Sequence, residues 1–76
     1  MVQAVEIKEW LTAGLPNAQI SVEGDGQHFH AIIISPQFMG KSLLQRQRMV
    51  YAALGERMGR EIHALSMQTL TPDQKA

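Results

Sequence analysis

The sequence predicts an α+β fold in which helices cover one face of a three-stranded sheet. Apolar residues recur at helical spacing in segments 5–15 and 42–58, whereas polar and apolar residues alternate in segments 19–23 and 62–70. A further run of strand-forming residues occupies positions 28–34. Glycines in the second helical segment divide it into two helices, so the predicted order is α-β-β-α-α-β.

The first segment places apolar side chains at spacings of two to four, which favours a helix with one buried face. These side chains are Val5, Ile7, Trp10, Leu11 and Leu15. Gly14 and Pro16 are expected to end the helix, because glycine and proline are typical of positions at and beyond a helix C-terminus.

A hairpin is expected next. Residues 19–23 alternate polar and apolar side chains, which is typical of a half-buried strand. Residues 24–27 contain two glycines and can turn the chain into the second strand, 28–34. Pro36 then ends the pairing, since proline has no amide hydrogen for the ladder.

The second helical segment begins at Ser42, a suitable N-cap, and runs to Met58. Gly55 and Gly59 weaken its second half. We therefore expect a break around Tyr51 to Gly55 that leaves two short helices. The third strand then runs from 62 to 70 and is ended by a turn at Thr71, Pro72 and Asp73.

The second strand has two predicted faces. If Phe29, Ala31 and Ile33 face the helices, Ile32 and Ile34 lie on the open face of the sheet. Two exposed isoleucines are ordinary on a protein surface. The other interpretation is a contact face for a partner or for a second copy of the chain.

Length and composition favour one domain over residues 1–76, with 45% hydrophobic and 18% charged residues. A domain of this size buries only about 60% of the surface that its unfolded chain exposes, which leaves little apolar material for a deep pocket. The serines stand in no nucleophile elbow, and no phosphate-binding loop is present. We expect a binding module and no enzyme.

The sequence also indicates a compartment. It contains no cysteine, so no disulfide braces the fold, which suits an intracellular protein. The longest apolar run, residues 31–34, is far short of the roughly 20 residues that cross a bilayer. Acidic residues in the first turns and the lack of a basic-then-apolar order argue against a secretory signal. We expect a cytoplasmic protein without a membrane span.

Charge is unevenly distributed although its formal sum is zero. Residues 1–40 carry one lysine against four acids, a balance of minus three, whereas residues 41–60 carry five basic residues against one acid, a balance of plus four. The middle of the chain is therefore a predicted basic patch.

Several runs together resemble the BolA family. They are FMGKSLLQRQRMVY at 38–51, EIHALS at 61–66 and TLTP at 69–72. The hairpin VEGDGQHF at 22–29 is similar to the IbaG-like subgroup, which carries a histidine-bearing loop at this place. The resemblance implies a fold like the class II KH domain, a monothiol glutaredoxin as partner, and a 2Fe-2S cluster shared with it.

The same resemblance implies two metal ligands. The family's near-constant histidine matches His63, and its second ligand, in the loop between the first two strands, falls on His28. Many members have histidine after the arginine that matches Arg46, but this chain has Gln47, which excludes a histidine ligand there.

Ligand chemistry permits such a role only as half of a site. Iron-sulfur clusters are normally held by four cysteine thiolates, and histidine nitrogen can replace thiolate on one iron, as in Rieske centres. A chain without cysteine can thus offer His63 and His28, while glutaredoxin and its bound glutathione bring the thiolates, as the resemblance implies.

The residues alone leave plainer interpretations open. His63 alternates with Leu65 and Met67, which is typical of a half-buried strand histidine, and His28 suits a solvated loop end. His28 and His30 share one face of a strand at about 7 Å and could bind a divalent metal as a pair.

The alternative function is that of a DNA-binding transcriptional regulator. Lys41, Arg46 and Arg48 lie on or beside a predicted helix-turn-helix, although a solvated helix face explains them equally. The glycines are never three apart, so the Gly-x-x-Gly loop of RNA-binding KH domains is missing. The leading prediction remains an adaptor in iron-sulfur cluster trafficking or in iron and stress regulation, with weak DNA contact and homodimerisation as open alternatives.

Overall fold

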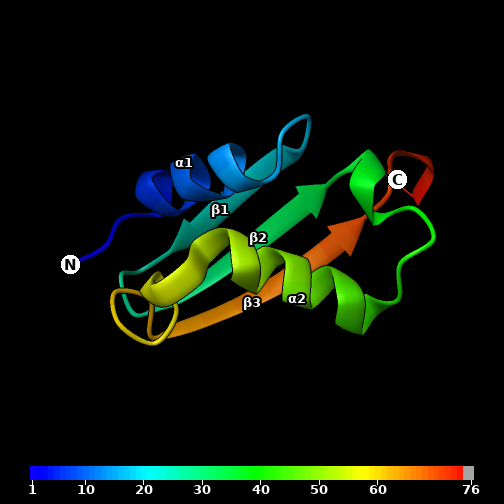
Figure 1. The fold of residues 1–76 in the computed structure, drawn as a ribbon. Coiled ribbons are helices and arrows are strands. Elements are labelled where there is room, and N and C mark those ends of the chain that lie inside the picture. Colours follow the sequence, from blue (N-terminus) through cyan, green and yellow to red (C-terminus); the bar gives the residue numbers. More distant parts are fainter. Residues whose placement is uncertain (75–76) are drawn as a thin grey trace.

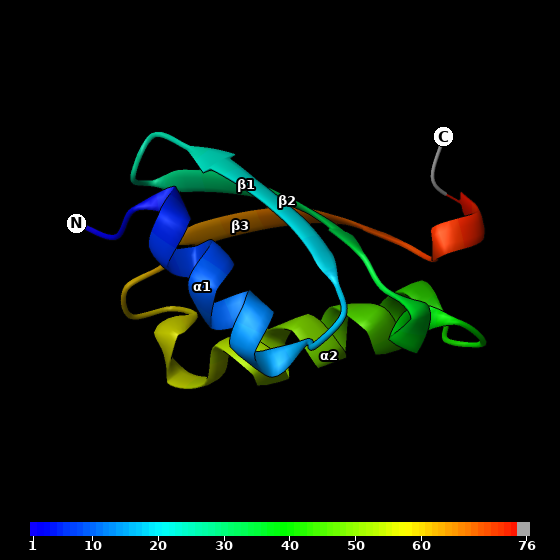
Figure 2. The ribbon, with the colours of Figure 1, turned by 90° about the horizontal axis from the view of Figure 1, so that it is seen from above.

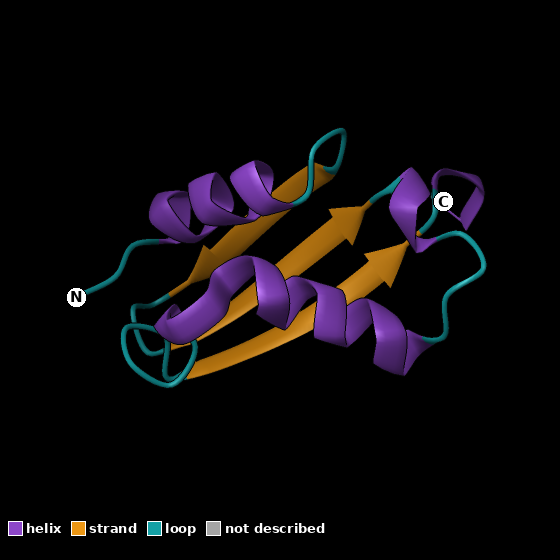
Figure 3. Cartoon of the chain, in the orientation of Figure 1, coloured by secondary structure: helices purple, strands orange, loops and turns teal. Residues whose placement is uncertain are grey.

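The computed structural model describes residues 1–74, which form two helices and three strands (Figures 1 and 3). Their bounds are α1 Ala4–Gly14, β1 Gln19–Gly24, β2 His28–Ile34, α2 Leu43–Leu54 and β3 Ala64–Leu70. Three 3-10 helices occupy Pro36–Phe38, Gly55–Arg57 and Pro72–Gln74. None of the described helices is long and apolar enough to span a membrane.

The strands form one sheet in the order β1-β2-β3. The tight loop 25–27 makes β1 and β2 antiparallel, whereas the crossover through α2 makes β3 parallel to β2. Both helices lie on the same face of the sheet, and the other face is left open (Figure 2). The predicted α+β architecture, its helix coverage and the order of its elements are confirmed.

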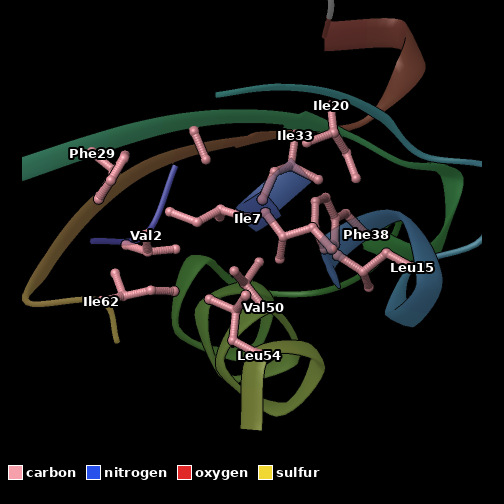
Figure 4. Close-up of a cluster of buried hydrophobic side chains, with 12 residues drawn as sticks. Val2, Ile7, Leu15, Ile20, Phe29, Ile33, Phe38, Val50, Leu54 and Ile62 are labelled. Carbon is pink, nitrogen blue, oxygen red and sulfur yellow. The ribbon is translucent and has the colours of Figure 1, made fainter. Parts of the chain in front are cut away.

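One cluster of apolar side chains fills the space between helices and sheet (Figure 4). Ile7 and Leu11 on α1, Ile33 on β2, and Val50 and Leu54 on α2 are completely buried. Phe29 and Ala31 join them from β2, whereas Ile32 and Ile34 are half-buried on the open face. The predicted division of β2 into two faces is therefore correct.

Helix α2 begins where the sequence predicts. Ser42 Oγ accepts a hydrogen bond from the Gln45 amide at 3.1 Å, and Gln45 Oε1 accepts one from the Ser42 amide at 2.8 Å. This reciprocal capping box satisfies two amides that the helix itself cannot pair. The helix therefore begins at Leu43, directly after its cap.

The break after α2 falls at the end of the expected range, Tyr51 to Gly55. The helix is continuous through Leu54, and its C-cap is Gly55, which has a φ of 60° that favours glycine. The second short helix is only the 3-10 turn Gly55–Arg57. Glycine weakens a helix interior, but Val50 and Leu54 are fully buried and hold the last turns in place.

The third strand begins later than expected, at Ala64 instead of residue 62. Ile62 is instead paired with Met58 in an isolated bridge, and its side chain is completely buried in the core. The turn between these two residues uses Gly59 at a φ of 88°. His63 therefore lies in the bend before β3.

Candidate functional site

His28 stands at the first position of β2 and is exposed. The loop before it is organised by Asp25, whose Oδ1 accepts hydrogen bonds from the amides of Gln27 and His28, both at 2.9 Å. The Asp25 amide in turn donates to the His28 carbonyl at 3.2 Å. These three bonds fix the backbone that carries the imidazole.

The amides also act on the Asp25 carboxyl group. Hydrogen bonds from the amides of His28 and Gln27 stabilise the carboxylate and hold the pKa of Asp25 below its ordinary value of 3.8. Asp25 was not among the predicted site residues. Its signal in the sequence was its place between two glycines before a histidine, since aspartate often caps backbone amides two or three residues ahead.

Gly24 lets the two strands of the hairpin approach each other closely beside His28. A Cβ at Gly24 would lie 2.4 Å from the His28 carbonyl oxygen and 2.9 Å from the Phe29 Cα. Both atoms belong to backbone, which cannot move aside as a flexible side chain can. The close approach of the two strands beside the histidine therefore requires glycine here.

His63 is positioned by the turn after α2. The Arg57 carbonyl accepts hydrogen bonds from the amides of residues 60–62, at 3.2, 3.0 and 3.0 Å, and the Gly59 amide donates to the Ile62 carbonyl at 2.9 Å. Ile62 anchors this turn in the core, and His63 follows it on the surface. The interpretation of His63 as a half-buried strand residue is wrong, because the strand has not yet begun.

The sheet brings the two predicted ligands to one end. In the parallel ladder, His28 is the register partner of Ala64, the residue that follows His63. Neighbouring strands lie about 4.8 Å apart, so Ala64 is a direct neighbour of His28. His63 precedes Ala64 in the chain and therefore lies close to His28. This proximity depends on a strand pairing that the local sequence does not reveal.

The donor set fits half of a shared metal site. Among residues 1–74, no group of three or more histidine, cysteine, aspartate or glutamate side chains is arranged to hold a metal. His28 and His63 are both exposed, so a partner that brings further ligands can approach them. The residues therefore fit the histidine contribution to a cluster whose other ligands come from elsewhere.

His30 has a partner that the sequence analysis missed. Its Nδ1 lies 2.7 Å from Ser66 Oγ on the neighbouring strand, at the open face of the sheet. His28 shares that face, as the alternation of β2 predicted. Divalent-metal binding by the two histidines stays a prediction, and it would compete with the hydrogen bond to Ser66.

Arg46 does not belong to an exposed basic surface, which corrects its assignment as a phosphate contact. Its side chain is 7% exposed and donates to the carbonyls of Lys41 at 3.1 Å and Thr69 at 3.0 Å, and to Gln74 Oε1 at 3.1 Å. Its guanidinium also lies 5.8 Å from the Phe38 ring centroid. The residue ties α2 to the end of β3.

Other cations of the predicted basic patch are also engaged. Arg57 stacks 4.4 Å from the centroid of Trp10, and Arg60 pairs with Glu56 at 3.9 Å. Lys41 and Arg48 are exposed and remain available to a ligand. In the predicted helix-turn-helix, the helix that follows α2 is only the 3-10 helix Gly55–Arg57, which is too short to act as a recognition helix.

These features define a small α+β domain that presents two imidazoles at one end of its sheet. The family model described as BolA-like protein matches residues 5–74. The chain belongs to the BolA-like protein family. The finer assignments to the IbaG-like subgroup and to a class II KH-like fold stay predictions.

Relatives agree in sequence and in fold. A bolA protein homologue from Coxiella burnetii is 49% identical, with a TM-score of 0.89 over 96% of this chain and 95% of that one. BolA-like protein 1 of Homo sapiens is 47% identical over 51 residues, 67% of this chain. That match spans 37% of the human protein, little more than a third of its length.

A third relative bears on the alternative function. The DNA-binding transcriptional regulator BolA of Escherichia coli strain K12 is 38% identical over 48 residues. The match covers 63% of this chain and 46% of that regulator.

Proposed function

We propose that this chain is an adaptor that binds a monothiol glutaredoxin and shares a 2Fe-2S cluster with it. The observation that carries the proposal is the exposure of His28 and His63 at one end of the sheet. Each would lend one imidazole nitrogen, while the glutaredoxin and its glutathione would bring the thiolates. The setting is the cytoplasm, and the process is cluster trafficking or iron and stress regulation.

Two features of the chain support ligation at this end. The hydrogen bond to Asp25 holds the backbone of His28. The buried side chain of Ile62 anchors the chain in the core directly before His63. A preorganised ligand loses less conformational entropy when it binds. The cluster, when bound, supplies redox-active iron, and imidazole in place of thiolate raises its potential.

The test uses the protein mixed anaerobically with a monothiol glutaredoxin and glutathione, followed by co-purification, visible absorption and circular dichroism. The unsubstituted protein is expected to form a coloured heterocomplex. His63→Ala and His28→Ala should each change the visible spectrum and speed cluster loss by roughly tenfold or more, since even the loss of a hydrogen-bond partner of a ligand usually weakens a metal site that much.

His30→Ala is the matched control, because it removes an exposed imidazole from the same strand without touching either proposed ligand. It should leave the visible spectrum unchanged. A heterocomplex with the same spectrum and cluster lifetime in the His63→Ala variant would refute ligation by His63. Failure of any coloured complex to form would refute the shared cluster.

DNA binding is the second candidate, and its support is the regulator from Escherichia coli, named as DNA-binding. The structure offers less for it than the sequence suggested. Of the three predicted contacts, Arg46 is committed to carbonyl and amide oxygens, which leaves Lys41 and Arg48. Two free cations give only weak, salt-sensitive attraction to phosphates.

A further inference from the structure

Strand β3 has a free outer edge. The Ser35 amide donates to the Leu70 carbonyl at 2.9 Å, so the backbone of Leu70 faces β2. Successive residues of a strand direct their backbone groups to opposite edges. The amides and carbonyls of Leu65, Met67 and Thr69 therefore face away from β2, on the side where the described residues, 1–74, add no further strand.

At one end of this edge a backbone carbonyl is already hydrogen-bonded, whereas the remaining outward groups are unpaired in the described part of the chain. Arg46 Nη1 donates to the Thr69 carbonyl at 3.0 Å and so caps the outer edge at that position. Within residues 1–74, no hydrogen bond is recorded to the outward groups of Leu65 and Met67 or to the Thr69 amide. Unpaired edge groups of this kind are a template for pairing with another strand.

A groove runs beside the same edge. It has a volume of about 440 Å³ and lies between α2, which contributes Leu43 and Gln47, and residues 65–70 of β3. Leu43 is 72% exposed, while Leu65 and Met67 are half-buried. A strand added along β3 would direct every second side chain into contact with these apolar groups.

The segments that form and flank the groove carry an excess of basic residues, of which Lys41 and Arg48 are exposed. Segments 35–55 and 64–74 contain three basic residues, Lys41, Arg46 and Arg48, against one acid, Asp73. The hydrogen-bond acceptors of Arg46 are all neutral oxygens, and its charge also interacts with the Asp73 carboxylate, so the exposed Lys41 and Arg48 provide the excess positive charge. A second copy docked by the same face would bring the same excess of positive charge, whereas an acidic segment complements it.

We propose that the groove between α2 and β3 binds an extended acidic segment of another protein, which pairs with β3 as a fourth strand. The backbone of β3 supplies hydrogen bonds, and the apolar groove receives alternate side chains. Neither the cluster nor its histidine ligands take part. The proposal can therefore fail while the glutaredoxin function stands, and the reverse also holds.

The test uses the isolated full chain and three blocked peptides with one common core of alternating threonine and valine. The flanks are two glutamates, two glutamines or two lysines at each end. We expect saturable binding of the glutamate peptide, about tenfold weaker binding of the glutamine peptide and weaker still for lysine. Absence of binding by all three peptides, or tighter binding of the lysine peptide, overturns the proposal.

Amide hydrogen exchange by NMR reports the mode of binding. The outward amides of Leu65, Met67 and Thr69 should exchange fast in the free chain and slow at least tenfold when the glutamate peptide is bound. The intervening amides, already directed to β2, should change little. Peptide binding that leaves the three outward amides unprotected overturns strand addition.

A pair of leucine variants and one proline variant localise the site. Leu43→Ser should weaken peptide binding about fivefold or more, whereas Leu44→Ser, a change at a 54% exposed leucine outside the groove lining, should not. Met67→Pro removes an outward amide, which an edge strand tolerates, and should abolish binding. If that variant does not fold, the comparison of the two leucines and the exchange pattern still decide.

Other occupants give different results. Peptide-free dimerisation at micromolar concentration that Leu43→Ser abolishes would assign the groove to a second copy and overturn the proposal. Displacement of the glutamate peptide by a single-stranded oligonucleotide, with the same dependence on Leu43, would overturn it in favour of nucleic acid.

Discussion

The Arg46 guanidinium on α2 donates from Nη1 to the Thr69 carbonyl on β3 across 3.0 Å. The same nitrogen reaches Gln74 Oε1 at 3.1 Å, and that oxygen also accepts the Thr71 amide at 3.0 Å. One buried cation thus joins the helix, the edge strand and the turn that follows it. Its role is to hold the layers together, and it has little surface to offer a ligand.

Arg46→Ala should lower the free energy of unfolding by about 2–4 kcal/mol, because it leaves buried carbonyl groups without their donor. Arg48→Ala is the matched control and should cost less than about 0.5 kcal/mol, since Arg48 is exposed. Urea titration followed by Trp10 fluorescence measures both. Equal destabilisation by the two changes would contradict a structural role for Arg46.

Gly24→Ala should lower the free energy of unfolding by about 2 kcal/mol or more, because the new Cβ meets backbone atoms of His28 and Phe29. Gly40→Ala is the comparison, since Gly40 has a φ of 76° but nothing within 4 Å of the added Cβ. Its cost should be about 1 kcal/mol, from backbone strain alone. Indistinguishable urea midpoints for the two variants would contradict the steric account of Gly24.

Periodicity in the sequence was sufficient for the helices, the hairpin and the inward face of β2. These features follow from local spacing, because helices and strands repeat their faces every 3.6 and two residues. The end of α2 lies at the far end of its expected range, and β3 starts at Ala64, later than the expected residue 62. Glycine locally disfavours helix, and the alternating pattern locally favours strand. Burial of Leu54 and Ile62 in the core overrides these local preferences, and burial depends on the whole fold.

The candidate site was accessible to sequence reasoning only in part. Resemblance to the family singled out His28 and His63, but their placement at one end of the sheet depends on the parallel register of β2 and β3. The contact between His30 and Ser66 depends on the same register. Arg46 was misassigned because nothing local distinguishes it from Arg48, two residues away, and only packing against β3 does.

The low pKa of Asp25 predicts a pH dependence of stability at the acid end. A carboxyl whose pKa is lower in the folded chain stabilises that state while ionised. Its contribution is therefore complete above its ordinary value of 3.8 and is lost as the pH falls from there through the lowered pKa. Urea midpoints measured from pH 7 to pH 2 should fall across this window.

Asp25→Asn keeps an acceptor oxygen but removes the charge, so it should lower stability at pH 7 and flatten that acid slope. Glu23→Gln neutralises a nearby carboxyl for which the structure gives no backbone hydrogen bond, and it should leave the slope nearly unchanged. An Asp25→Asn variant with the full acid slope would show that other carboxyls, such as Asp73, account for it.

His28→Ala and His63→Ala should leave the isolated chain nearly as stable as before, within about 0.5 kcal/mol, because both side chains are exposed. This near-neutrality matters for the cluster experiment, since a lost spectrum then reports lost ligation. Thermal unfolding by circular dichroism checks it. A large drop in the unfolding midpoint for either variant would assign that histidine a structural role.

The salt dependence of DNA binding distinguishes a regulator from an adaptor. Lys41 and Arg48 are the two cations of the predicted patch that are left free. The logarithm of the DNA-binding constant should therefore fall with the logarithm of salt concentration at a slope of about −1.8, which is about −0.9 for each neutralised phosphate. Lys41→Ala and Arg48→Ala should each reduce the slope by about 0.9, whereas Lys8→Ala, an exposed change on α1, should not. Fluorescence anisotropy of a labelled duplex gives these slopes. A slope of about −5 or steeper would require more phosphate contacts than these two cations supply, and it would favour DNA binding over the adaptor function.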